Sequence, residues 1–97
     1  MDYIVFDLEW NQGKTAQEAK AAILPFEIVE IGGVKLSCDS ALGKSRITGE
    51  YSRLIKPVVY HEMNQITGKL IHLEMRELEQ GMPFSEAAEG FLRWCGS

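Results

Sequence analysis

Two carboxylates near the start of the chain, Asp7 and Glu9, are spaced to act together on one face of a strand. Alternate strand residues point to the same side, with Cα atoms roughly 6.5 to 7 Å apart, while Phe6, Leu8 and Trp10 point to the other side. Like charges at this spacing raise the pKa of one carboxyl or bind a cation, and Mg²⁺ and Mn²⁺ prefer carboxylate oxygen. The pair indicates either a divalent-metal site or, as in most Asp-x-Glu sequences, an acidic strand face that meets only water.

Three strands are predicted around this pair. The β-branched and aromatic run of residues 3–10 predicts a buried strand. Residues 11–24 fit a long loop with about two helical turns. Residues 26–36 predict a second strand, with a bulge or a close backbone approach at Gly32-Gly33, and residues 50–56 predict a third strand that ends at Pro57. The three strands would form an antiparallel meander.

Helical signals follow the third strand. Residues 61–79 predict a short helix, a turn around Thr67-Gly68 and a second short helix. Residues 85–95 predict a better helix, with Ser85 as N-cap, Gly96 beyond its end and apolar residues at helical spacing. A meander must cover one apolar face, and these helices are the only available cover. We therefore predict an α/β fold in the order β-β-β-α-α.

Composition restricts the chain to a single small domain. The chain has 97 residues, 45% of them hydrophobic, with ten basic and fourteen acidic side chains. No apolar run approaches the roughly 20 residues of a membrane span, and we expect no membrane partner. The two cysteines, Cys38 and Cys95, form neither a disulfide framework nor a zinc motif, and the start lacks a secretory signal. We therefore expect a cytoplasmic protein with reduced thiols.

Charge is unevenly distributed along the chain. Residues 31–70 carry six Lys or Arg against three acids, whereas the formal net charge of the whole chain is −4. An acidic protein is not a simple basic nucleic-acid module, so any nucleic-acid chemistry must come from a site. The basic middle segment indicates either phosphate contacts or a solvated hairpin.

The context of Asp7 and Glu9 matches a known pattern. Four collinear segments carry the match, and they are 5–11 (VFDLEWN), 25–34 (PFEIVEIGGV), 54–57 (LIKP) and 66–68 (ITG), followed by Trp-Cys-Gly at 94–96. Together they resemble the DEDD superfamily of 3′→5′ exonucleases, of the DEDDh type, and most closely its RNA-trimming and sporulation-inhibitor-type members. The resemblance implies a ribonuclease-H-like α/β fold.

The resemblance also assigns roles at the metal site. It implies that Asp7 and Glu9 are catalytic and bind two divalent metal ions, Mg²⁺ or Mn²⁺, which activate water and stabilise charge on the scissile phosphate. Glu30 matches a recurrent family position near the site, although a residue of the second strand explains it equally well.

A second group of residues would bind substrate by the same resemblance. The backbone around Leu8 and Trp10 would line the pocket for the terminal nucleotide, and Thr67 and Leu70 would lie beside the terminal bases. Here Lys69 and Leu70 stand where the family more usually has an apolar residue and Thr.

Part of the family's site has no counterpart in the chain. The superfamily needs two further Asp and a general-base His, whereas the remaining aspartates are Asp2 and Asp39. We expect His61 and His72 to be surface or capping residues. The resemblance therefore implies that residues 1–97 are the N-terminal half of one exonuclease domain, without the second and third motifs.

Two functions and one assembly state are expected. The first function is a metal-dependent 3′→5′ exonuclease acting on single-stranded RNA or DNA ends, of which this chain would be a fragment without activity of its own. The alternative is a non-catalytic module that binds nucleic acid or protein through the basic middle segment. Because the fold lacks the later strand beside the first one, we expect a homodimer or a domain-swapped assembly through that edge.

Overall fold

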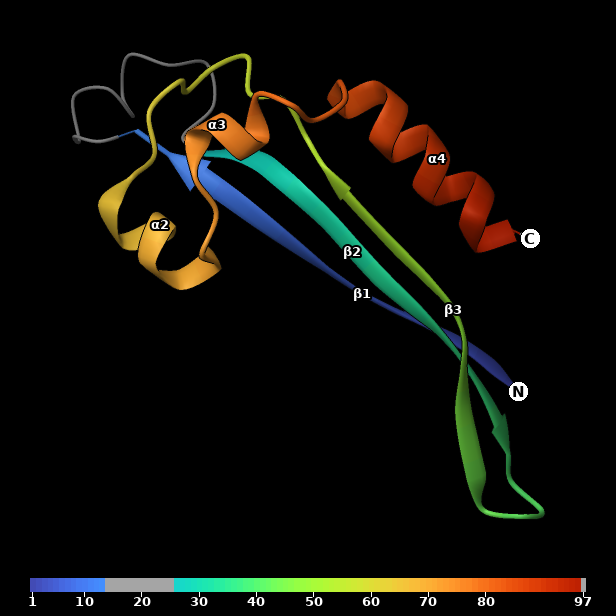
Figure 1. Cartoon of the computed structure of the whole chain (residues 1–97). Helices are drawn as coiled ribbons and strands as arrows, with labels where there is room; N and C mark the ends of the chain where they lie inside the picture. The colour runs from blue at the N-terminus through green and yellow to red at the C-terminus, as the bar shows by residue number, and fades with distance from the viewer. Residues whose placement is uncertain (14–25, 97) are drawn as a thin grey trace.

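The computed structural model describes residues 1–13 and 26–96 of the chain. The elements, in chain order, are β1 (Asp2–Gln12), β2 (Phe26–Asp39), β3 (Lys44–Leu54), α2 (Gln65–Ile71), α3 (Met75–Leu78) and α4 (Phe84–Gly96). Figure 1 shows a long, narrow sheet, with α2 beside β1 and α4 beside β3. The predicted α/β class, a three-stranded antiparallel meander followed by helices, is confirmed. Most of the predicted loop at 11–24 lies outside the described residues.

The sheet has the order β1-β2-β3, with both neighbours antiparallel. The bulge predicted at Gly32-Gly33 lies instead at Val29, because Glu9 pairs with Glu30 whereas Trp10 pairs with Ile28. The close backbone approach is present, since a Cβ added to Gly33 would lie 3.1 Å from the indole ring of Trp94.

The prediction that the first strand is buried is wrong. Phe6 is 58% exposed, Val5 is 55% exposed and Trp10 is 51% exposed. Among the described strands β1 pairs only with β2, so one edge of β1 is open to solvent. Strong β-propensity therefore predicted the strand correctly but not its position in the sheet.

The β2–β3 hairpin is longer than predicted, because β3 begins at Lys44 rather than at residue 50. Residues 44–49 lack the apolar alternation of a strand, and pairing with β2 is what extends them. The turn is stabilised by Asp39, whose Oδ1 accepts hydrogen bonds from the N–H groups of Ala41 and Leu42. Gly43 closes the turn at φ 63°, a conformation that favours glycine.

The short helices differ from prediction in their boundaries. Thr67 and Gly68 lie inside α2 rather than in a turn, because Asn64 caps the helix just before them. The turn after α2 falls at His72, which has a left-handed φ of 56° and caps the C-terminus. The expectation that His72 is a capping residue is confirmed.

Helix α4 lies on the opposite side of the sheet from α2 and packs against the core. It begins at Phe84, so Ser85 lies in its first turn and is not its N-cap. Ala87, Phe91 and Trp94 pack against Tyr51, whose hydroxyl donates a hydrogen bond to the Ala87 carbonyl oxygen at 2.7 Å. Among the described residues, no helix is both long and apolar enough to cross a membrane.

Candidate functional site

The sheet brings three carboxylates together. Asp7 and Glu9 share one face of β1 by strand alternation, and the register places Glu30 of β2 opposite Glu9. Side chains directly opposite one another across an antiparallel pair have Cβ atoms about 4.5 to 5.5 Å apart. We call the side of the sheet that carries Asp7, Glu9 and Glu30 the acidic face.

Crowding on the acidic face perturbs Glu30. Burial raises the pKa of the Glu30 carboxyl above its usual range, and the nearby charges of Glu9 and then Asp7 raise this pKa further. The Oδ1 atom of Asp7 accepts a hydrogen bond of 3.0 Å from the N–H of Leu8. The carboxylates therefore concentrate negative charge on the acidic face, and such a concentration of negative charge attracts a cation.

We expect Glu30→Gln to stabilise the protein at neutral pH. With a pKa raised on folding, ionised Glu30 destabilises the folded state above that pKa, and this penalty disappears as the pH falls below the unfolded value near 4.3. The gain should be about 0.5 kcal/mol, a value appropriate to one solvent-screened like-charge contact, or roughly 2 to 4 °C in Tm. Melting curves in a metal-chelating buffer between acid and neutral pH measure it.

The control for this prediction is Asp2→Asn, which removes the same charge from an exposed position of β1 on the other face of the sheet. An equal Tm gain in both variants, or a gain in Glu30→Gln that persists at acid pH, would show that repulsion on the acidic face is not its cause.

The donor set of the acidic face fits part of a divalent-metal site. Asp7 and Glu9 supply carboxylate oxygens, which Mg²⁺ and Mn²⁺ prefer, from alternate positions of β1. Among the described residues, however, no three His, Cys, Asp or Glu side chains converge closely enough to hold a metal ion. The acidic face can therefore contribute two ligands, and a complete coordination shell needs oxygens from elsewhere.

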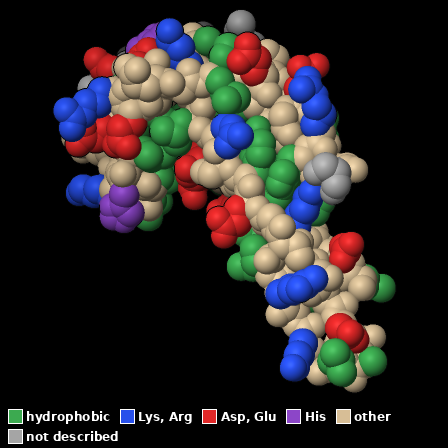
Figure 2. Space-filling model, turned by 45° about the vertical axis from the view of Figure 1, so that its right-hand side comes forward, with side chains coloured by type: hydrophobic (Ala, Val, Ile, Leu, Met, Phe, Trp, Pro, Cys, Tyr) green, Lys and Arg blue, Asp and Glu red, His purple; other side chains and the backbone are tan. Residues whose placement is uncertain are grey.

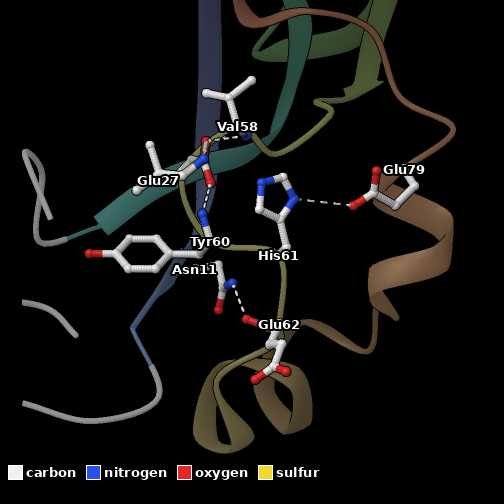
Figure 3. A network of polar contacts seen from close by, with 8 residues as sticks. Asn11, Glu27, Val58, Tyr60, His61, Glu62 and Glu79 are labelled. Carbon is white, nitrogen blue, oxygen red and sulfur yellow. Dashed lines mark hydrogen bonds and ion pairs between the residues drawn. The ribbon is translucent and has the colours of Figure 1, made fainter.

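Two asparagines hold α2 against the end of β1. Asn11, buried and on the same face of β1 as Asp7, donates from Nδ2 to the Glu62 carbonyl oxygen at 3.0 Å (Figure 3). Its Oδ1 accepts a hydrogen bond from the N–H of Asn64 at 2.9 Å. Asn64 in turn donates from Nδ2 to the Gly13 carbonyl oxygen, and its Oδ1 caps the N-terminus of α2. This double link fixes α2 beside the acidic face.

A buried glutamate organises the loop that leads to α2. Glu27, 8% exposed, accepts hydrogen bonds from three consecutive N–H groups: Val58 and Val59 at Oε2 and Tyr60 at Oε1, at 2.8 to 3.0 Å. Figure 3 shows its carboxylate turned into this loop. Glu27 therefore positions the loop that leads to α2.

The sequence alone indicates no role for Asn11, Glu27 or Asn64. Asn64 had a readable signal, because Asn is a preferred N-cap and the helical pattern follows it. The partners of Asn11 and Glu27 lie more than 30 positions away in the chain, and no local pattern reveals such pairings.

The predicted substrate-contacting residues lie on different parts of the structure. Thr67 is 8% exposed within α2, whereas Leu70 is 74% exposed. The side chains of Leu8 and Trp10 point away from the acidic face, so only their backbone is available there, as the resemblance implied. The structure thus brings α2 to the end of β1 but leaves the predicted nucleotide-binding roles of these residues as predictions.

The clearest groove lies on the far side of the sheet from the carboxylates. It has a volume of about 460 Å³ and an apolar lining that includes Phe6 and Leu8 of β1 and Phe84 and Leu92 of α4. Because its lining contains no carboxylate, this groove is not part of the acidic face. It marks an incompletely covered part of the core.

The histidine before α2 and the two cysteines agree with their expected states. His61 is exposed, with Nδ1 at 3.7 Å from a carboxylate oxygen of Glu79 (Figure 3), which agrees with the expected surface role. Cys38 and Cys95 are both free thiols, as predicted.

Comparison with known proteins identifies the fold. No protein-family model matches the chain, and no curated protein sequence matches it significantly. Among solved structures, cell-death related nuclease 4 superposes with a TM-score of 0.73 at 18% identity, over 97% of this chain and 29% of that one. A full-length 3′-exonuclease gives 0.71 at 10% identity, over 96% of this chain and 28% of that one.

A third neighbour is named by its family. The nuclease domain of 3′hExo, a DEDDh family member bound to rAMP, gives a TM-score of 0.72 at 12% identity, over 96% of this chain and 42% of that one. The chain therefore spans less than half the length of each of these neighbours. Its fold is that of the DEDDh 3′-exonucleases, in the ribonuclease-H-like α/β class.

Proposed function

We propose that the chain is the N-terminal half of a metal-dependent 3′→5′ exonuclease domain that hydrolyses phosphodiester bonds at single-stranded RNA or DNA ends. One observation carries the proposal: Asp7 and Glu9 share an acidic face with Glu30, on the first strand of a fold found in DEDDh 3′-exonucleases. The 3′hExo nuclease domain binds rAMP, which supports a nucleotide ligand for this chain.

In this proposal Asp7 and Glu9 are catalytic residues because they hold Mg²⁺ or Mn²⁺ against the scissile phosphate. A bound metal pair would supply an activated water and stabilise charge on the phosphate oxygens. The backbone around Leu8 and Trp10, together with Thr67 and Leu70 on α2, would receive the terminal nucleotide. Asn11 and Asn64 act as positioning residues, since they attach α2 to the strand that carries the carboxylates.

Activity of the 97-residue chain alone should be low or absent. Two further aspartates and a general-base histidine are needed, and we assign none of the chain's own residues to those roles. The reduced thiols accord with a cytoplasmic protein. The non-catalytic binding module remains the alternative, because the basic residues of segment 31–70 would serve either function.

The experiment that tests the proposal is Mn²⁺ binding to the full chain. We expect paramagnetic broadening of the amide signals nearest the carboxylates, those of Leu8 and Gly32, and loss of that broadening in Asp7→Asn/Glu9→Gln. The control Glu74→Gln/Glu77→Gln removes the same charge from α3 and should broaden like the wild type. Broadening that survives Asp7→Asn/Glu9→Gln, or full-rate cleavage of a labelled oligonucleotide by the chain alone, would contradict the proposed site.

We also propose that two copies of the chain pair along the free edge of β1. This edge is bordered by exposed apolar side chains, including Tyr3, Val5 and Phe6, and by the apolar groove beside α4. An exposed, hydrophobic edge strand is a template for pairing with a second strand. A two-fold antiparallel arrangement would continue the sheet across both copies.

A further inference from the structure

The β2–β3 hairpin carries every lysine and arginine of the described strands on one face of the sheet. The strand register shows that these four side chains share a face. Arg53 is opposite Ile31, Lys35 is opposite Gly49, Arg46 is opposite Ser37, and Lys44 is opposite Asp39. Residues opposite one another share a face, and positions 31, 35, 37 and 39 of β2 are an even number of residues apart. We call Lys35, Lys44, Arg46 and Arg53 the basic stripe.

A β-bulge in β3 creates this alignment. The register shifts after Lys35, which pairs with Gly49, so that Leu36 pairs with Ile47 and Thr48 is the extra residue. In a regular strand Arg46 would face away from Arg53, because the two lie an odd number of positions apart. The bulge reverses the alternation and turns Arg46 and Lys44 to the side of Arg53.

Two contacts with aromatic rings show on which side of the sheet the basic stripe lies. Lys35 Nζ lies 4.9 Å from the centre of the Trp94 ring of α4, and the guanidinium carbon of Arg53 lies 4.7 Å from the centre of the Tyr51 ring. The basic stripe therefore lies on the α4 side, opposite the acidic face. Figure 2 shows Lys and Arg side chains following one another along the projecting part of the hairpin.

Few acidic side chains lie near Lys44 and Arg46, which form the outer half of the basic stripe. Asp39 and Asp2 lie on the same face, but the Oδ1 of Asp39 is engaged by the N–H groups of the hairpin turn. Within the described part of the chain, neither Lys44 nor Arg46 forms an ion pair, and both are exposed. The strand residues of the acidic face include five carboxylates, those of Asp7, Glu9, Glu27, Glu30 and Glu50, and no cation, so the sheet separates its charges by side.

We propose that the basic stripe binds the phosphate backbone of a single-stranded nucleic acid, upstream of the end held at the acidic face. This inference rests on the proposed function, from which it takes the nucleic-acid ligand. From Arg53 to Lys44, β3 runs for about 30 Å at roughly 3.4 Å per residue, a length comparable to the several nucleotides that a single-strand groove holds. The stripe supplies the positive charge that an acidic protein lacks overall.

The number of phosphate contacts predicts the salt dependence of binding to the basic stripe. Each phosphate contact on a single strand contributes about −0.7 to the slope of log affinity against log salt. Removing two contacts should therefore reduce the steepness of that slope by about 1.4 and weaken binding about 25-fold at roughly 0.1 M salt.

The test measures fluorescence anisotropy of a labelled single-stranded oligonucleotide of about 14 nucleotides, long enough to follow the whole stripe, in EDTA, over a range of salt concentrations. The full chain is compared with Lys44→Gln/Arg46→Gln. A control variant, Arg76→Gln/Arg93→Gln, loses the same charge from the exposed helix positions of α3 and α4. We expect the loss of affinity for the long oligonucleotide in Lys44→Gln/Arg46→Gln only, with both variants retaining the wild-type melting temperature.

Three outcomes would overturn the inference. They are unchanged binding by Lys44→Gln/Arg46→Gln, an equal loss in the control variant, and displacement of the long oligonucleotide by polyglutamate at equal charge, which would identify an acidic polypeptide as the ligand. Asp7→Asn/Glu9→Gln should bind the long oligonucleotide in EDTA at least as well as the wild type. Failure of the metal site and failure of the stripe therefore give separate results.

Discussion

Replacing Glu27 with alanine is expected to lower the free energy of unfolding by about 3 kcal/mol, or Tm by roughly 12 to 24 °C. The substitution leaves the N–H groups of Val58, Val59 and Tyr60 without their acceptor in a part-buried loop. Each unsatisfied buried donor costs about 1 to 3 kcal/mol, which is large against a total stability of about 5 to 15 kcal/mol. Thermal and urea unfolding measure the change.

Matched variants separate this effect from loss of charge. Glu27→Gln keeps one oxygen acceptor and should give an intermediate loss, whereas Glu50→Ala, at an exposed position of β3, should change stability by less than about 0.5 kcal/mol. Hydrogen exchange at Gly68 and His72 in α2 should quicken in Glu27→Ala, because the loop leads into that helix. Similar stabilities for Glu27→Ala and Glu50→Ala would mean that this carboxylate does not hold the loop.

Replacing Ile4 with proline is expected to convert a homodimer into a monomer, seen by sedimentation or light scattering at micromolar concentrations. Met1 and Cys38 exchange both backbone hydrogen bonds, at 2.8 and 2.9 Å. Odd-numbered β1 residues up to Glu9 therefore bond to β2, and the N–H groups of Ile4 and other even-numbered residues point to the free edge. Proline at position 4 removes an edge donor without removing a bond of the β1–β2 ladder.

Val5→Pro is the comparison for this experiment. The N–H of Val5 points to β2, so proline there breaks a ladder bond and should lower Tm, whereas Ile4→Pro should melt close to the wild type. A wild-type chain that sediments as a monomer at every concentration, or a dimer that withstands Ile4→Pro, would exclude pairing through this edge.

The sequence predicted those features that depend on residues close together in the chain. Alternation placed Asp7 and Glu9 on one side of a strand, and the break at Pro57 separated the strands from the helices. Boundaries failed where pairing or capping decided them: β3 extends to Lys44 because β2 pairs with it, and α2 includes Thr67 because Asn64 caps it. Of the apolar residues at helical spacing in 85–95, Phe91 packs against the core, whereas Leu92 is 72% exposed.

The sequence by itself determined the order of elements, the acidic pair and the excess of cations in the middle of the chain. Only the tertiary structure decided how these features combine. Pairing between β1 and β2 brought Glu30 to Glu9, Asn11 and Asn64 joined across 53 positions to dock α2, and the bulge at Thr48 set the hairpin cations on the side away from the carboxylates. The physical reason is that strand register and long-range hydrogen bonds depend on partners distant in sequence, whereas alternation and capping depend on neighbours.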